Sequence, residues 1–174
     1  MDKGYIEENP MRKVRIDSKL FRPVRKKDSS TQVLMEHEEK DYKELAWERF
    51  KQRKHTKQPL TPLAVLFLLQ TGLRIGELRA LTYSDITDDG RHIVINKMIR
   101  NETGEIVDYT KGKYGDREVL LSDEAIRIIE TAREFQKKKG ASTEGYIFSM
   151  TETPIGYYAV NTASSEKNCL TICE

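Results

Sequence analysis

The most constraining stretch of the sequence is an apolar segment that ends in a glycine and a single arginine. Seven consecutive apolar residues run from Leu63 to Leu69, and Gly72 then permits a tight turn. Apolar residues return at helical spacing directly after Arg74. The stretch therefore predicts a buried helix, a corner, and a second helix that begins near Arg74.

Arg74 has two possible roles at this corner. It can be an ordinary residue that faces solvent. It can also bind an anion, because backbone N–H groups and the helix dipole favour negative charge at the start of a helix.

Helical patterns lie on both sides of the corner. They predict helices at residues 31–54, 61–70, from about 75, and 122–139. We expect a break in the first near His37–Asp41, and Thr61 as the capping residue of the second with Pro62 in its first turn. Ser122 should cap the last helix, and Gly140 should end it.

β-branched residues between the last two helices predict short strands. These are expected at residues 92–99, 106–110 and 117–121. Because glycine-containing turns separate them, they predict a three-stranded antiparallel meander, and the fold class is α+β and mainly helical. The polar run after Pro154 shows no clear periodicity.

Basic residues are concentrated locally although the formal net charge is only +2. Between residues 11 and 27, one acid stands against eight bases: Arg12, Lys13, Arg15, Lys19, Arg22, Arg25, Lys26 and Lys27. A second cluster comprises Arg49, Lys51, Arg53, Lys54 and Lys57. Such clusters are typical of a chain with a polyanionic partner, but solvated faces and linkers carry them too.

The composition argues against several other classes of protein. Cys169 and Cys173 are the only cysteines and have no histidine near them, so neither a metal site nor a disulfide framework is expected. No apolar run is long enough to span a membrane, and no signal peptide is evident. We expect a cytoplasmic protein without cofactors.

The order of these features resembles the catalytic domain of the tyrosine recombinases, or phage-type integrases. Three segments carry the resemblance. Thr71 to Leu78, continuing through Ile86, is similar to the family's first catalytic-arginine box. Thr110 to Lys113, with Arg117 to Leu121, is similar to the turn with the catalytic lysine, and Gly4 to Pro10 is similar to the exit from the core-binding domain. Residues 1–30 would then be the end of that domain and a basic linker, and residues 31–174 a truncated catalytic domain.

The resemblance implies a metal-independent attack of a tyrosine hydroxyl on a phosphodiester of double-stranded DNA, which is the expected partner. Arginines hold the non-bridging oxygens, and a lysine protonates the departing 5′ oxygen. Arg74 would be the first clamp and Lys111 the acid, with Lys113 as its alternative. Glu77, one turn after Arg74, either orients it or is a solvated helix residue. Expected contacts to the DNA backbone are Arg12, Lys13, Arg15, Arg25, Lys26, Lys27 and Lys113.

Other parts of the family pattern are missing from the sequence. The histidines, His37, His55 and His92, all precede the lysine turn, so no His-x-x-Arg box can be placed. No arginine follows Arg133, and Tyr157 and Tyr158 come too soon after the turn to be the nucleophile. We therefore expect a truncated or frameshifted gene, or the edge of an expressed fragment, and no DNA cleavage by this chain alone.

Three functions remain open at this point. The chain can be a shortened recombinase domain with residual DNA affinity. It can be a non-catalytic DNA-binding or regulatory fragment of a mobile-element integrase. It can also be an unrelated basic α+β protein in which Arg74 and Lys111 are ordinary surface residues. Self-association, or assembly with a full-length recombinase, is a possible consequence of the first two.

Overall fold

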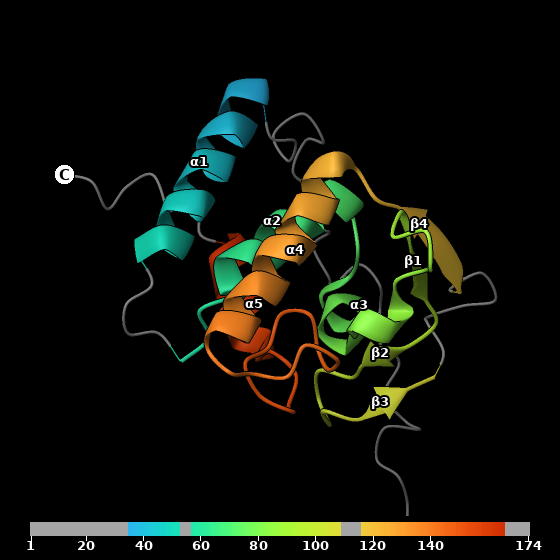
Figure 1. Ribbon diagram of the computed structural model, residues 1–174. Helices are drawn as coiled ribbons and strands as arrows, with labels where there is room; N and C mark the ends of the chain where they lie inside the picture. The colour runs from blue at the N-terminus through green and yellow to red at the C-terminus, as the bar shows by residue number, and fades with distance from the viewer. Residues whose placement is uncertain (1–34, 53–56, 109–115, 166–174) are drawn as a thin grey trace, which may run out of the picture. The chain divides into compact units, whose positions relative to one another are not determined.

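The computed structural model describes residues 35–52, 57–108 and 116–165 (Figure 1). The chain divides into two units, Met1–Met35 and Glu36–Glu174, and the description below concerns the second. Its elements are α1 (Glu36–Gln52), α2 (Thr61–Thr71), α3 (Ile75–Ala80), the short 3-10 helix η4 (Tyr83–Asp85), β1 (His92–Ile95), β2 (Met98–Ile99), β3 (Ile106–Val107), β4 (Arg117–Leu120), α4 (Asp123–Lys138) and α5 (Tyr157–Ser165). The expected α+β class is confirmed.

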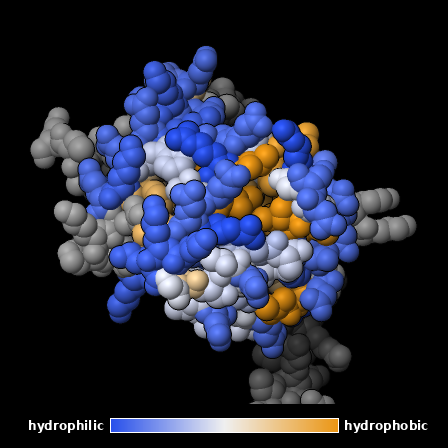
Figure 2. All heavy atoms as spheres, in the orientation of Figure 1, coloured by the Kyte–Doolittle hydropathy of each residue, from blue (hydrophilic) through white to orange (hydrophobic). Residues whose placement is uncertain are grey.

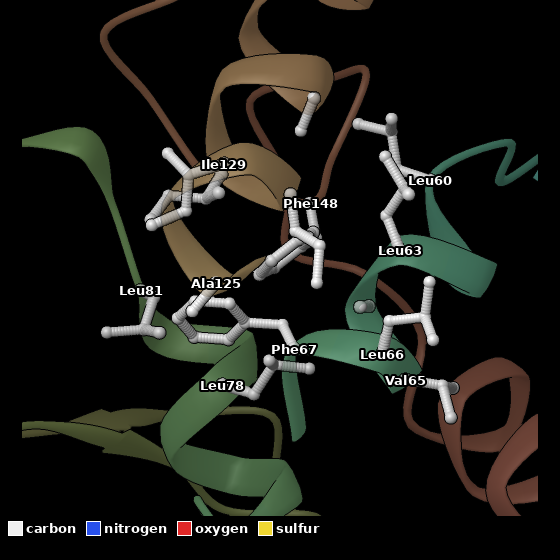
Figure 3. Close-up of a cluster of buried hydrophobic side chains, with 14 of the residues drawn as sticks. Leu60, Leu63, Val65, Leu66, Phe67, Leu78, Leu81, Ala125, Ile129 and Phe148 are labelled. Carbon is white, nitrogen blue, oxygen red and sulfur yellow. The ribbon is translucent and has the colours of Figure 1, made fainter. Parts of the chain in front are cut away.

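Helix α2 lies at the centre of the core, as its apolar sequence predicts. Its buried residues are Leu63, Ala64, Val65, Leu66 and Phe67, and it packs against α1, α4 and α5. Figure 3 shows Phe67 among side chains from the neighbouring elements, including Leu78 and Ala125. The Phe67 and Phe148 rings are 5.3 Å apart between centroids. A helix that is apolar on every side is thus covered on every side.

The ends of α2 confirm one expectation and correct another. Gly72 takes the left-handed conformation with φ of 64°, and its N–H donates to the carbonyl of Leu68, so the tight turn is confirmed. Thr61 does not cap the helix. The cap position belongs to Leu60, and the Thr61 hydroxyl instead donates to the Gln58 carbonyl at 2.9 Å.

Helix α1 is continuous, so the expected break near His37–Asp41 is wrong. The polar residues there lie in the first turns of the helix, where acidic side chains interact favourably with its dipole. An ion pair of 2.6 Å between Glu39 and Lys43, spaced i and i+4, adds support. Polarity at this place reflects a solvated helix face.

The strands are antiparallel as expected, but they do not form one meander. β1 pairs with β4 and β2 pairs with β3, in two separate two-stranded sheets. The first expected strand is interrupted after Ile95. At this break Lys97 donates to Asp85 at 2.8 Å and to Thr82 at 3.2 Å, so its side chain is used for an ion pair beside η4.

Two features after β4 escaped the sequence pattern. Helix α5 forms at Tyr157–Ser165, where no regular element was expected, because Val160 is fully buried against the core and α2 contacts the helix. On α4, Gln136 is fully buried. It accepts a hydrogen bond from the Tyr83 hydroxyl and donates to the carbonyls of Tyr146 and Ile147.

The surface is mainly hydrophilic on the face shown in Figure 2, where polar side chains cover α1 and the outer side of α4. Hydrophobic atoms show between α4 and the strands. Ile106 and Leu120 are the large apolar strand residues that are exposed, at 51% and 67%. No helix within the described ranges is long and apolar enough to cross a membrane.

Gly76 lets α3 lie directly on β2. A Cβ at this position would be 2.8 Å from the backbone oxygen of Ile99, which is closer than a carbon and an oxygen can approach without movement. The contact involves backbone, so it cannot be relieved by rotating a side chain. Glycine is therefore required directly after the start of α3.

We expect Gly76→Ala to lower the free energy of unfolding by about 2 kcal/mol, because either α3 or β2 must shift. Gly145→Ala is the matched control, since its Cβ would meet only the Ser142 hydroxyl, at 3.9 Å. The control should change stability by less than about 1 kcal/mol. Urea unfolding measures both, and equal effects would refute the steric explanation.

Candidate functional site

Arg74 stands at the N-terminal end of α3 with an exposed side chain. Its backbone is extended, with φ of −73° and ψ of 148°, and its side chain is 60% exposed. The backbone N–H donates to Oε2 of Glu77 at 3.0 Å, and Nη1 donates to Oε1 of the same carboxylate at 3.0 Å. Arg74 is thus anchored at both ends by one residue.

The start of α3 offers little to an external anion through its backbone. The helix has only six residues, and the Arg74 backbone N–H is already bonded to Glu77. The negative group at the start of α3 is therefore the chain's own Glu77. Binding of an external anion would depend on the exposed guanidinium.

Glu77 is completely buried, with no exposed side-chain surface. The alternative that it is a solvated helix residue is therefore wrong, while its orienting role stays a prediction. Burial alone would raise the pKa of Glu77, but hydrogen bonds from Arg117 and Arg74 outweigh it and hold the pKa below its ordinary value. The carboxylate is charged.

Arg117 is the second partner of Glu77, and it comes from β4. Its Nη1 donates to Oε1 at 3.2 Å and its Nη2 to Oε2 at 2.9 Å, which is the two-pronged arrangement of a strong arginine–carboxylate pair. The hydrogen bonds to Glu77 raise the pKa of Arg117. One negative charge thus lies between two positive ones, and the cluster of Arg74, Glu77 and Arg117 carries a net charge of +1.

From the sequence, Arg117 was expected only to begin a strand, and no role in the site was predicted for it. A usable signal existed, because residues two apart on a strand share a face and Arg117 is two residues before the half-buried Val119. Glu118 and Leu120, on the other face, are exposed. An arginine on the inward face needs hydrogen-bond acceptors inside the fold, and this pattern alone does not identify Glu77 as the residue that supplies them.

Other buried charges near α3 are used within the fold. The Arg79 Nε donates to the carbonyl of Ile155 at 2.8 Å, and its Nη1 donates to Asn101 at 3.2 Å. Asp85 pairs with Lys97 at 2.8 Å. By contrast, Nε and Nη2 of Arg74 have no partner among residues 35–52, 57–108 and 116–165.

The remaining expected site residues cannot be compared with this geometry. Lys111 and Lys113, and the six arm residues Arg12, Lys13, Arg15, Arg25, Lys26 and Lys27, lie outside the described residues. Convergence of Arg74 and Lys111 on one phosphate therefore stays a prediction. In the part of the chain that the structure describes, no group of three or more His, Cys, Asp or Glu side chains could hold a metal ion.

The chain belongs to the phage integrase family, whose model matches residues 38–167. No curated protein sequence matches it. Membership in this family excludes the alternative of an unrelated basic α+β protein.

Solved structures with the same fold include an integrase, in two complexes, and a recombinase. The Tn1549 transposon integrase in complex with transposon right end DNA has a TM-score of 0.59 at 20% identity, covering 87% of this chain and 47% of that one. The same integrase in complex with circular intermediate DNA has a TM-score of 0.55 at 19% identity, covering 81% and 45%. The XerA recombinase has a TM-score of 0.54 at 19% identity, covering 92% and 48%. The chain spans about half the length of these proteins.

Proposed function

We propose that this chain acts in site-specific DNA recombination and supplies part of the phosphate-binding apparatus of a tyrosine-recombinase catalytic domain. Arg74 binds a non-bridging oxygen of a DNA phosphodiester, Glu77 orients Arg74, and Lys111 protonates the departing 5′ oxygen. The observation that carries the proposal is the exposed Arg74 guanidinium, which is anchored on a completely buried carboxylate.

The chemistry of the cluster suits a phosphate. An arginine remains charged at any physiological pH and can contact two oxygens in one plane. Because Glu77 holds Nη1 of the guanidinium, less conformational freedom is lost when Nε and Nη2 bind an anion. The two Tn1549 integrase structures above contain DNA, which agrees with the proposed substrate.

The proposal extends to residues beyond the described ranges. Residues 1–30 would be the end of a core-binding domain and a basic linker, with Arg12, Lys13, Arg15, Arg25, Lys26 and Lys27 on the DNA backbone. Residues 31–174 would belong to the catalytic domain, with Lys113 on the backbone near Lys111. With DNA as substrate, we expect the protein to act in the cytoplasm.

The roles proposed for this chain are phosphate binding and proton donation. The sequence contains no histidine after His92 and no arginine after Arg133, so the second arginine and the histidine of the family pattern are not assigned. Tyr158 is 81% exposed, and its ring packs edge-on against Tyr157 with centroids 5.5 Å apart. Neither tyrosine is assigned as the nucleophile.

The test is binding of duplex DNA by the wild-type chain and by Arg74→Ala, followed by fluorescence anisotropy over a range of salt concentrations. Wild-type affinity should fall steeply with salt because phosphate contacts release counterions. Loss of one phosphate contact should weaken binding by about tenfold and reduce the slope against salt by about 1.

Arg127→Ala is the matched control. Arg127 is 67% exposed against 60% for Arg74, but it pairs with Glu124 and lies over the Trp47 ring. This control should bind DNA nearly as the wild type does. Salt-independent binding, or equal losses for Arg74→Ala and Arg127→Ala, would contradict the proposal.

A further inference from the structure

We propose that Arg117 is a positioning residue that holds the Glu77 carboxylate and thereby leaves the charge of Arg74 available to a phosphate. This inference rests on the proposed function of Arg74. It adds a role for a strand residue that lies forty positions away from Glu77 in the sequence.

The two arginines share the hydrogen bonds to the Glu77 carboxylate unequally. Oε1 of Glu77 accepts from Arg74 Nη1 at 3.0 Å and from Arg117 Nη1 at 3.2 Å. Oε2 accepts from the Arg74 backbone at 3.0 Å and from Arg117 Nη2 at 2.9 Å. Each oxygen thus serves both arginines. Arg74 therefore contacts the carboxylate with a single guanidinium nitrogen, while Arg117 holds it with two.

The charges of Arg74, Glu77 and Arg117 do not balance. One carboxylate cannot neutralise two guanidiniums, so one positive charge is left in the cluster. The Arg74 side chain is 60% exposed and that of Arg117 is 34% exposed. The positive charge that Glu77 does not neutralise is therefore accessible from solvent mainly at Arg74. Without Arg117, Glu77 and Arg74 would form a neutral pair and attract a phosphate less strongly.

Arg117 belongs to a different element from Glu77 and Arg74. It is the first residue of β4, and it pairs with Ile95 of β1. The bonds between Arg117 and Glu77 therefore fasten the beginning of α3 to a strand that starts six positions after Lys111 in the sequence. Arg117 thus links Arg74 to the strand that follows the proposed general acid.

Few other titratable groups surround Glu77. On its own helix, Arg79 is bonded to Ile155 and Asn101. The neighbouring α2 and β2 carry no charged residue, and α5 contributes Tyr157 and Tyr158 as titratable groups. Among the described residues, the charged groups bonded to Glu77 are Arg74 and Arg117. Removing Arg117 should therefore raise the pKa of Glu77 and make it protonate more readily.

The experiment measures duplex DNA binding by Arg117→Met from about pH 5 to about pH 8, relative to the wild type at each pH. At the upper end, Arg117→Met should bind about tenfold more weakly, because Glu77 then neutralises Arg74. The difference in DNA affinity between Arg117→Met and the wild type should become smaller as the pH falls and Glu77 becomes protonated. The double variant Arg117→Met/Glu77→Gln should recover binding to within about twofold of Glu77→Gln at every pH, since no carboxylate remains to neutralise Arg74.

Arg117→Lys tests the same point with less disturbance of the fold. It keeps the charge but loses the two-pronged contact, so it should bind more strongly than Arg117→Met at the upper end of the pH range. Arg127→Met is the control for loss of an exposed arginine, and circular dichroism checks folding. Should Arg117→Met not fold, Arg117→Lys with and without Glu77→Gln provides the comparison, and Glu77→Gln should again remove the deficit.

The two proposals fail in different ways. A deficit that is independent of pH and unchanged by Glu77→Gln would show that Arg117 only stabilises the fold, and would overturn this inference. Unaltered binding by Arg117→Met, with clear loss in Arg74→Ala, would also overturn it. If Arg74→Ala itself binds DNA as the wild type does, the proposed function of the site is wrong.

Discussion

Replacing Glu77 with alanine is expected to lower the free energy of unfolding by about 3 kcal/mol, near the lower end of the range for breaking a buried ion pair. Removal of the completely buried carboxylate leaves Arg74 and Arg117 facing each other without a counter-charge. The loss should not be larger, because Arg74 can turn fully into solvent. Urea unfolding followed by circular dichroism gives the value.

Glu39→Ala is the control for this variant. Glu39 is 41% exposed and forms a single ion pair with Lys43 along α1. Its loss should cost less than about 0.5 kcal/mol, as for other exposed pairs of this spacing. If Glu77→Ala and Glu39→Ala lower the free energy of unfolding by similar amounts, the ion pairs of Glu77 with Arg74 and Arg117 do not contribute to stability as buried ion pairs do.

The largest effect on stability is expected for Phe67→Ala, at about 4 kcal/mol. Phe67 has no exposed surface, lies at the centre of α2, and packs against the ring of Phe148 (Figure 3). Its truncation opens a cavity between α2 and α4 that the surrounding helices cannot fill without shifting. Thermal and urea unfolding both report the loss.

Tyr158→Ala is the matched control for the removal of an aromatic ring. Tyr158 is 81% exposed and contacts the ring of Tyr157. The control should change the free energy of unfolding by less than about 0.5 kcal/mol. A loss of only that size for Phe67→Ala would contradict the placement of α2 at the centre of the core.

Local patterns were sufficient for the parts of the fold that depend on neighbouring residues. The apolar run of α2, the tight turn at Gly72 and the Ser122 cap of α4 were all predicted, and the structure confirms each one. They follow from side-chain burial and backbone geometry within a few positions of the chain. The Thr61 cap was predicted from the same kind of signal and is wrong, because the hydroxyl bonds to Gln58 instead.

Features that depend on distant residues were not predictable in this way. The break between β1 and β2 coincides with the contact of Lys97 with Asp85, twelve positions away. Helix α5 is short and weakly patterned, and it forms where Val160 can pack against the core. Burial of Gln136 depends on carbonyls supplied by residues 146–149. Tertiary contacts decide each of these features.

In the candidate site, too, the contact between neighbouring residues was predictable from the sequence and the contact between distant residues was not. Arg74 and Glu77 lie three positions apart, so the sequence could suggest that one orients the other. The contact of Arg117 with Glu77 joins a strand to a helix, and no pattern of local spacing predicts such a pair. The resemblance to tyrosine recombinases correctly indicated the family. The role of Lys111 stays a prediction.

The central claim is that Arg74 binds DNA phosphate through the part of its guanidinium that Glu77 leaves free. The most direct test is nuclear magnetic resonance of the arginine side-chain Nε–Hε groups during titration with a duplex oligonucleotide. The Arg74 signal should shift in a saturable manner and return on addition of salt, while the Arg127 signal stays in place. If DNA binds and the Arg74 signal does not move, the central claim is contradicted.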